Sequence, residues 1–385
     1  MQNQLPEGVD LYIEKIVPGG YGIARTEAGT FFARYVIPGE TIRAKKWEKK
    51  KGVYFVTAYE IIQPSPIRIE PRCGYFTLCG GCSFQMGSYD AQIGWKKQIL
   101  VDSFQRIGSL RSFSENDIKE VIKGEEWEYR YRARFQVRDG VTGFFKAGSN
   151  MIVAIKECPV MRASINDAYT IVGEFINDSE STEFIRTLRA FEIKVNLNED
   201  ACSIVFIAAS GNGAKSFVSR LSRKLEELFD TVSLYVSYSR TELPGKGYRL
   251  LYGAERIFNQ YKQLSFGFSP LSFFQPNLRL AIKTYEKIAD ILKEREGRKI
   301  IDFYSGSGVL DLFLADDFEV LGIEVNPYSH EDAIQNAFIN EKKIEFLNLD
   351  VSLIENIEAA DTVVLNPPRA GVAGNLIKAI GVKPQ

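Results

Sequence analysis

The sequence predicts a multidomain chain with an N-terminal β-barrel, a central α+β domain and a C-terminal doubly wound α/β domain. Short strand-like runs separated by Gly and Pro fill residues 8–62. Three cysteines follow within ten residues, at 73–82. From residue 277 onward strand-like and helix-like segments alternate, as in a parallel sheet with crossover helices. We therefore expect domains at 1–66, 67–268 and 269–385.

The charge is unevenly distributed along the chain. Residues 1–148 carry a net charge of +5 and the remainder −6, for an overall charge of −1. The first part is the better candidate for contact with a polyanion, although an ordinary solvated surface has the same charge. No apolar run of about 18 residues and no secretory leader occur, so we expect a cytoplasmic chain without a membrane partner.

The single histidine, His330, lies in a polar helix-like stretch, where a surface position is expected. Histidine metal sites and Ser-His-Asp triads need an imidazole in a cleft, so both are nearly excluded.

The predicted barrel contains a basic segment at its longest hairpin. Lys45, Lys46 and Trp47 lie in the run KKWEKKK. Cations around an aromatic ring suit single-stranded RNA, through phosphate contact and base stacking. A solvated turn is an equally good interpretation of this feature alone.

The cysteine spacing predicts a metal centre. Cys73, Cys79 and Cys82 form C-x5-C-x2-C, and Cys158 follows far downstream. Without an export signal, such thiols favour metal binding over disulfides. The loop can wrap an iron–sulfur cluster with its fourth ligand from another segment, and a zinc site of four cysteines is the alternative. Cys202, in the apolar run CSIVFIAA, is predicted to be a buried core residue.

The central domain also contains a strand, 129–138, with one cationic face. Alternation places Arg130, Arg132 and Arg134 on the same side. Such a face needs carboxylates or phosphates; the acidic segment 125–128 is the structural candidate and RNA the functional one, which we favour. Further strands are expected around a helix at 214–229, and the helix at 93–108 is expected to pack either within this domain or on the C-terminal one.

The C-terminal domain has the pattern of a nucleoside-binding fold. Gly306 and Gly308 form a turn after a strand, and Glu324 ends the next strand, where it suits the two ribose hydroxyls. Asp350, after the third strand, is placed to meet the adenine edge. The fourth strand ends in Asn366 and two prolines, a rigid loop that distinguishes the pattern from a dehydrogenase.

Taken in order, these motifs resemble the RNA (uracil-5-)-methyltransferase family with a TRAM domain and a [4Fe–4S] cluster. The similarity runs from about residue 8 to residue 385 and rests on the cysteine motif followed by SFQ, and on YRARF, SFFQPN, DFYSGSG, GIEVN and NPPRAG. The resemblance implies a monomer acting on RNA, ribosomal rather than transfer RNA. It implies cluster ligands at Cys73, Cys79, Cys82 and Cys158. It implies a S-adenosylmethionine site at Gln275, Tyr304, Gly306, Glu324, Asp350 and Asn366.

Two departures from the family qualify the expected activity. Asn366 replaces the usual Asp and cannot supply its charge. By resemblance the nucleophilic cysteine and the glutamate base lie beyond residue 385, as do strands that would cover the apolar edge TVVL. We therefore expect a truncated chain that binds better than it catalyses. The alternatives are a non-catalytic RNA-binding protein and an amino-group methyltransferase using Asn366, although Arg369 stands where the latter has an aromatic residue.

Overall fold

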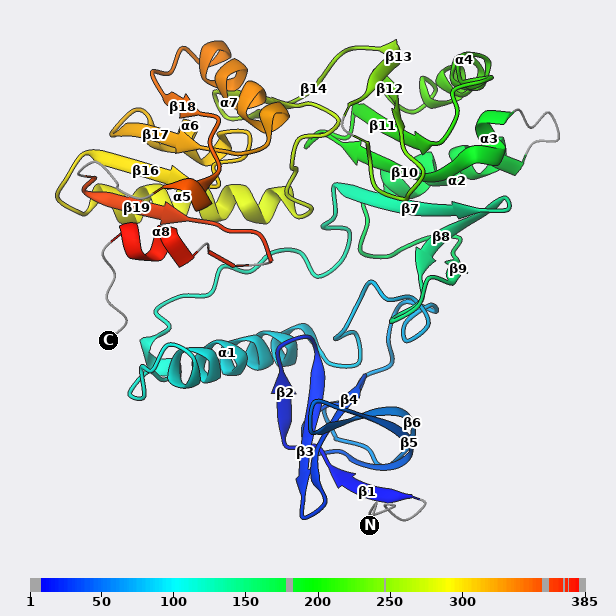
Figure 1. Ribbon diagram of the computed structural model, residues 1–385, viewed down its shortest axis with the longest axis vertical. Coiled ribbons are helices and arrows are strands. Elements are labelled where there is room, and N and C mark those ends of the chain that lie inside the picture. The colour runs from blue at the N-terminus through cyan, green and yellow to red at the C-terminus, as the bar shows by residue number, and fades with distance from the viewer. Residues whose placement is uncertain are drawn as a thin grey trace. The chain divides into compact units, whose positions relative to one another are not determined.

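The computed structural model describes residues 8–177, 183–245, 247–354, 360–369, 371–372 and 374–380. The chain forms two compact units (Figure 1). The first holds the residues up to Val121 together with Phe144–Val153, and the second holds Ile122–Gly143 and the residues from Ala154 onward. In the described ranges no helix is long and apolar enough to cross a membrane.

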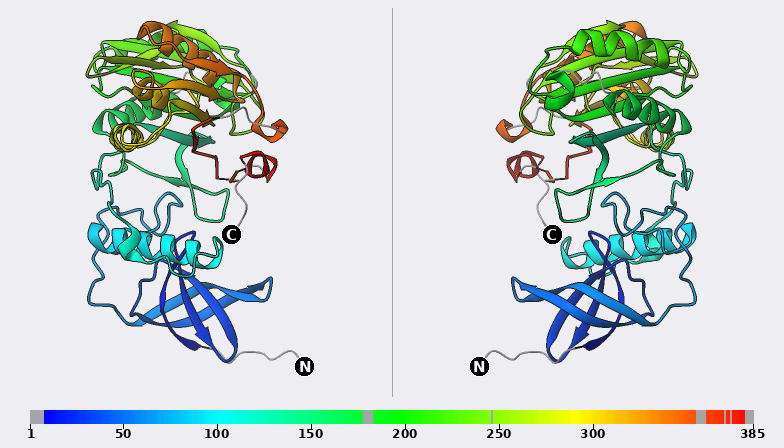
Figure 2. Two further views of the ribbon diagram at one scale, coloured as in Figure 1. Left: turned by 90° about the vertical axis from the view of Figure 1, so that its left-hand side faces the viewer. Right: turned by 90° about the vertical axis from the view of Figure 1, so that its right-hand side faces the viewer.

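The first unit begins with six strands, drawn in blue in Figures 1 and 2. They are β1 (Val9–Tyr12), β2 (Lys15–Val17), β3 (Tyr21–Thr26), β4 (Gly29–Arg34), β5 (Thr41–Lys50) and β6 (Val53–Gln63). They form one sheet in the order β1-β5-β6-β4-β3-β2. Leu11, Phe31 and Ile42 are fully buried or nearly so inside it, and alternate residues of each strand supply this core.

A helix and the cysteine loop complete the first unit. Helix α1 (Tyr89–Arg106) begins at Ser88, whose hydroxyl accepts a hydrogen bond from the Ala91 N–H, and a short 3-10 turn, η1 (Glu115–Asp117), follows. The helix lies against β2, where Asp102 forms an ion pair with Lys15. This contact with a strand of the barrel was not among the positions expected from the sequence.

The second unit contains a seven-stranded sheet in the order β13-β12-β11-β10-β7-β8-β9. Its strands are β7 (Arg132–Arg138), β8 (Val141–Phe145), β9 (Ile152–Ala154), β10 (Leu188–Val195), β11 (Ala201–Ala208), β12 (Thr231–Tyr238) and β13 (Arg249–Gly253); β9 and the end of β8 belong to the first unit. Helices α2 (Ala163–Asn177) and α4 (Ala214–Leu225) pack together over the sheet (Figure 2), and α3 (Glu183–Thr187) precedes β10. Cys202 of β11 is fully buried, which confirms the prediction.

The last part of the chain is a four-stranded parallel sheet in the order β18-β17-β16-β19. The strands are β16 (Lys299–Phe303), β17 (Glu319–Ile323), β18 (Glu345–Leu347) and β19 (Thr362–Leu365). The helices are α5 (Leu278–Lys293), α6 (Val309–Leu314), α7 (Pro327–Ile339), the 3-10 turn η2 (Val351–Leu353) and α8 (Gly374–Ala379). A hairpin of β14 (Ile257–Tyr261) and β15 (Leu264–Phe268) precedes α5. The strand order reverses next to β16, so a ligand crevice is expected at the carboxyl ends of these strands.

Candidate functional site

The turn between β16 and α6 has the backbone of a ligand-binding loop. Tyr304 and Gly306 have positive φ angles of 65° and 60°, and Gly308, at 73°, caps α6. A Cβ on Gly308 would lie 2.9 Å from the Phe346 ring, so this position requires glycine. A Cβ on Gly306 would meet nothing within 4 Å, so a ligand is able to approach its backbone closely.

Glu324 faces this turn from the end of β17. Its Oε2 accepts a hydrogen bond of 2.9 Å from the Gly306 N–H, and its Oε1 accepts one of 2.7 Å from the Asn326 N–H. A carboxylate oxygen accepts two hydrogen bonds, so each oxygen keeps capacity for a further donor. The two adjacent hydroxyls of a ribose are donors of this kind.

The other predicted cofactor residues lie around the same edge of the sheet. Asp350 follows β18 and is exposed; it caps η2 by accepting a hydrogen bond of 2.9 Å from the Ser352 N–H. Asn366 follows β19 in an exposed loop. Because all four strands are parallel, their carboxyl ends share one edge, to which Tyr304 and Glu324 also belong.

Gln275 lies in the segment before α5. Its side chain hydrogen-bonds to Tyr285 of α5, and burial raises the pKa of that tyrosine to about 12. Asn277 begins the helix by accepting the Leu280 N–H at 3.1 Å. Gln275 is thus held beside α5 by side-chain and capping contacts.

Two acids beneath the turn were missed by the sequence analysis. Asp302 of β16 is 3% exposed and Asp311 of α6 is fully buried. In the described part of the chain, Oδ1 of Asp302 and both carboxylate oxygens of Asp311 have no hydrogen-bond partner. Burial and the neighbouring Asp311 raise the pKa of Asp302 well above its usual value, and burial raises the pKa of Asp311 to about 7. The available signal was an acid inside the apolar run VLDLFLA.

The arginines of β7 meet a buried carboxylate, and the acidic partner proposed from the sequence is wrong. Arg132 Nη2 and Arg134 Nε donate to Glu192 of β10 at 2.9 and 3.0 Å. Glu125, from the acidic segment upstream, instead accepts a hydrogen bond of 2.8 Å from Arg279. Burial works against the charged form of Glu192, yet the surrounding cations hold its pKa below the usual value.

A cavity of about 470 Å³ opens beside these arginines, lined also by residues 270–272 and 326–328. Next to it Lys194 is 1% exposed, and its Nζ donates to the carbonyl oxygens of Ser269, Pro270 and Ser272 at 3.3, 2.9 and 3.2 Å. Burial lowers the pKa of Lys194 to about 8. Lys194, Arg132 and Arg134 surround the single carboxylate of Glu192, so the cavity wall has excess positive charge. Lys194 was not among the site residues predicted from the sequence, although it lies two residues from Glu192 on β10.

The other candidate RNA residues are placed differently from one another. Lys45 pairs with Glu60, and Lys46 is exposed. Trp47 packs edge-on against buried Phe31, with ring centroids 6.3 Å apart. Trp47 lies within β5, before the hairpin tip, and is half-buried against the barrel core; its contact with RNA stays a prediction. Arg130 precedes β7. Within the described residues its buried Nε has no hydrogen-bond partner.

The five cysteines are thiols without disulfide partners. Cys73 and Cys82 pack at one apolar cluster of the first unit, and the sulfur of Cys79 accepts the Gly81 N–H at 3.4 Å. Cys158 belongs to the second unit. Within the described ranges no three Cys, His, Asp or Glu side chains are grouped as metal ligands.

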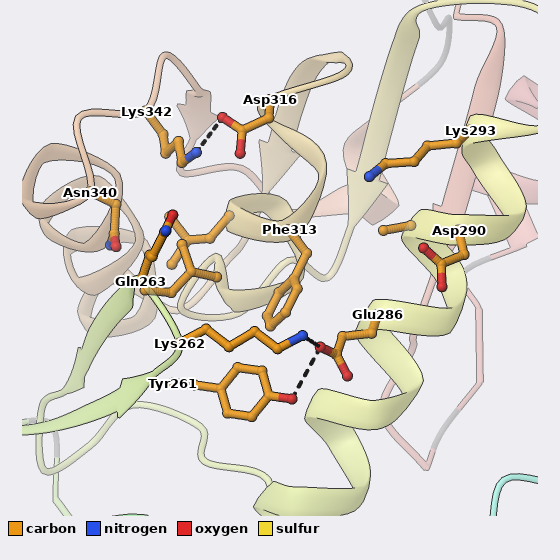
Figure 3. Close-up of a pocket in the computed structure, with 13 residues that line it drawn as sticks. Tyr261, Lys262, Gln263, Glu286, Asp290, Lys293, Phe313, Asp316, Asn340 and Lys342 are labelled. Atoms are coloured by element: carbon orange, nitrogen blue, oxygen red, sulfur yellow. Dashed lines mark hydrogen bonds and ion pairs between the residues drawn. The ribbon is translucent and has the colours of Figure 1, made fainter.

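A larger cavity, of about 800 Å³, lies among the β14–β15 hairpin, α5, α6 and the end of α7 (Figure 3). Its charged groups largely neutralise one another: Glu286 bonds both Lys262 and Tyr261, and Lys342 pairs with Asp316. It lies at the carboxyl ends of helices rather than of strands, away from Glu324. None of the cofactor residues predicted from the sequence lines this cavity.

A parallel sheet that reverses its strand order beside a glycine-containing turn, with an acid at the end of the second strand, defines a nucleoside-binding α/β protein. Comparison with known proteins specifies the family. The model for tRNA (Uracil-5-)-methyltransferase matches residues 88–359, and the TRAM-domain model of a tRNA (uracil(54)-C(5))-methyltransferase matches residues 9–67. The chain belongs to the RNA (uracil-5-)-methyltransferase family and carries an N-terminal TRAM domain.

Two relatives and one solved structure illustrate the similarity. An uncharacterized RNA methyltransferase of Prochlorococcus marinus is 30% identical over 90% of this chain and 86% of its own length. The 23S rRNA (uracil(1939)-C(5))-methyltransferase RlmD of Nitrosococcus oceani is 28% identical over 93% of this chain and 81% of its own. The Pyrococcus abyssi tRNA (uracil-54, C5)-methyltransferase, solved with S-adenosyl-L-homocysteine, shares the fold with a TM-score of 0.74, at 24% identity over 96% of this chain and 86% of that one.

Proposed function

We propose that the chain binds S-adenosylmethionine at the β16–α6 turn and acts on the C5 position of uracil in RNA, with ribosomal RNA preferred over transfer RNA. The cofactor supplies an electrophilic methyl group on a sulfonium. The observation that carries the proposal is the carboxylate of Glu324, held by two backbone N–H groups at the end of β17 with acceptor capacity to spare. Family membership supports the reaction, and the RlmD relative supports the RNA class.

Within this site each residue has a proposed role. Glu324 binds the ribose hydroxyls, and Gly306 lets the cofactor lie close to the backbone of the turn. Gln275, Tyr304, Asp350 and Asn366 line the rest of the site, with Asp350 at the adenine edge. Asn366 differs from a carboxylate in carrying no charge, so it orients a ligand only by hydrogen bonding.

Methyl transfer is tested with the chain as it is, radiolabelled S-adenosylmethionine, and two RNA substrates, ribosomal and transfer. We expect the chain to bind both ligands better than it transfers methyl groups, with tighter binding of ribosomal than of transfer RNA and any label on uracil C5. Label on an exocyclic nitrogen would contradict uracil as the target. Binding of both RNA and cofactor without any transfer would favour the non-catalytic alternative.

We further propose that RNA contacts the cationic wall of the 470 Å³ cavity. Arg132 and Arg134, which line the cavity, and Arg130, just before β7, would contact phosphates, while Lys45, Lys46 and the half-buried Trp47 would contact RNA on the TRAM domain. The excess of positive charge around Glu192 supports an anionic ligand, because buried like charges are stable only with a counter-charge.

The cavity is tested by the variant Arg134→Gln and the matched control Arg138→Gln, which lies on the same strand but outside the cavity. Loss of a phosphate contact should weaken RNA binding about equally for all sequences and reduce the salt slope by about one. The control should change neither. Equal effects of the two variants would indicate a diffuse electrostatic contribution and no phosphate site in the cavity.

The cysteines Cys73, Cys79, Cys82 and Cys158 are proposed as ligands of a [4Fe–4S] cluster, with zinc as the alternative. The spacing and the family resemblance support this, and no chemical step is assigned to the metal. Anaerobic purification followed by iron, sulfide and zinc analysis separates the two metals. Protein free of all three would contradict both.

A further inference from the structure

Asp302 and Asp311 are two buried acids whose negative charge and hydrogen-bonding capacity are not balanced by the described residues around them. Among the described residues, three of their four carboxylate oxygens have no hydrogen-bond partner outside the pair, and Asp302 and Asp311 are 3% and 0% exposed. A buried polar atom without a partner destabilises the fold, and more so when it is charged. The hydroxyl of Ser305, in the adjoining turn, is also buried without a partner. Among the described residues, no cation and no donor outside the pair therefore bonds to these three carboxylate oxygens.

The groups that act on the pair add to this imbalance. Glu324 acts from the end of β17 and raises the pKa of Asp302 further, after burial and Asp311. Tyr285 faces the pair from α5, and its own pKa is raised by burial and by both acids. None of these groups is a cation. Two buried carboxyl groups that interact directly with each other, as Asp302 and Asp311 do, are stable when they share one proton.

The ligand of the proposed site has the missing charge. S-adenosylmethionine carries a sulfonium and an ammonium against one carboxylate, a net charge of +1. The described residues proposed to line its site include no lysine or arginine, and two of them, Glu324 and Asp350, are acids. A cation that binds beside the turn thus interacts favourably with ionised Asp302 and Asp311.

We propose that Asp302 and Asp311 hold one shared proton in the cofactor-free protein and release it to solvent when the cationic cofactor binds, so that Asp311 is a positioning residue for cofactor charge. The inference rests on the proposed function. Before binding, the shared proton forms a hydrogen bond between the two carboxyl groups. After binding, the charge of the cofactor replaces the proton, and the site gains one negative charge.

The sign of the pH dependence follows from proton linkage. Free protein binds one proton more than the complex, so affinity rises with pH while the free pair is protonated. Because the pKa of Asp311 is raised to about 7, the dissociation constant should fall about tenfold per pH unit between about pH 5.5 and pH 6.5 and level off above about pH 7.5.

The experiment counts protons by calorimetry in two buffers of different ionisation enthalpy. S-adenosylmethionine should release about one proton at pH 6, whereas uncharged 5′-methylthioadenosine should release essentially none. S-adenosylhomocysteine, which lacks the sulfonium, should fall between them. An equal release for the cationic and the uncharged ligand would overturn the charge mechanism.

Variants assign the proton to the pair. Asp311→Asn should abolish the release and flatten the pH profile, and Asp316→Asn, an exposed acid just beyond α6, should leave both unchanged. An unchanged release in Asp311→Asn would overturn the proposal. If that variant does not fold, the ligand comparison in the unmodified protein still decides. Absence of any cofactor binding would instead contradict the proposed function, so the two failures are distinguishable.

Discussion

At the scale of single residues, Glu324 links local backbone geometry to ligand chemistry. Its two oxygens accept the N–H groups of Gly306 and Asn326, which lie in segments on either side of the crevice edge. The same carboxylate therefore stabilises the turn and is a candidate hydrogen-bond acceptor for the ribose hydroxyls. An amide at this position retains only one acceptor oxygen, so both roles weaken together.

Glu324→Gln is expected to reduce S-adenosylmethionine affinity by about tenfold or more, the equivalent of losing about 1.5–3 kcal/mol of charged hydrogen bonding. Titration calorimetry measures this. Glu319→Gln, at the exposed start of the same strand, is the matched control and should bind normally. Normal binding by Glu324→Gln would show that the ribose lies elsewhere.

Cys202 shows how burial alone sets reactivity. Desolvation raises the pKa of this thiol far above its usual value, so almost no nucleophilic thiolate forms at pH 8. In metal-free protein, iodoacetamide should label Cys73, Cys79, Cys82 and Cys158, which are partly exposed, and should reach Cys202 only after unfolding. Mass spectrometry of labelled peptides gives the answer. Rapid native labelling of Cys202 would contradict its burial.

At the scale of secondary-structure elements, α7 and β15 are joined by a matched ladder of side chains. Asp332, Asn336 and Asn340 accept the backbone N–H groups of Ser269, Gly267 and Ser265 at 2.7, 2.8 and 2.9 Å. Four residues of helix rise about 6 Å and two residues of strand about 6.6 Å, so the spacings coincide. The helix thus satisfies backbone donors along this strand.

Asn336 is the central member of this ladder and also reaches the cofactor turn. Its Nδ2 donates to the carbonyl of Ser307 at 2.9 Å, and the residue is 1% exposed. Asn336→Leu should therefore lower the free energy of unfolding by about 2–4 kcal/mol and weaken cofactor binding. Urea denaturation with and without S-adenosylmethionine measures both effects. Gln335→Leu, at the exposed neighbouring position, should change stability by less than about 0.5 kcal/mol.

At the scale of the whole molecule, the chain passes between its two units three times, near residues 121, 143 and 153. Each unit has its own buried cores: Leu11, Phe31 and Ile42 in the first, and Ile300, Leu314 and Phe303 among those of the second. Units with separate cores are able to unfold separately, although the crossings couple them through the backbone.

Phe31→Ala should lower the stability of the first unit by about 3–5 kcal/mol and leave cofactor binding by the second unit intact. Calorimetry should then show two unfolding transitions, and S-adenosylmethionine should raise the midpoint temperature of only the later one. Phe338→Ala, at an exposed ring of α7, is the control and should shift neither. A single unfolding transition whose midpoint temperature rises with the ligand would show that the units unfold together.

The sequence by itself determined the features that depend on neighbours along the chain. Alternation in β7 placed its arginines on one face, and the apolar run of β11 placed Cys202 in the core. The Gly306 turn and Glu324 were identifiable because parallel α/β sheets repeat at a regular spacing. The family was recognisable because its motifs occur in order.

Only the tertiary structure decided which distant side chains meet. Glu192 lies about sixty residues from the arginines that it binds, and adjacent strands bring them together, whereas the nearer acidic segment points elsewhere. Likewise Asp302 and Asp311 form a pair because a strand and the following helix bury both. Sequence patterns encode periodicity within an element, but the register and burial that pair two elements depend on the packing of the whole core.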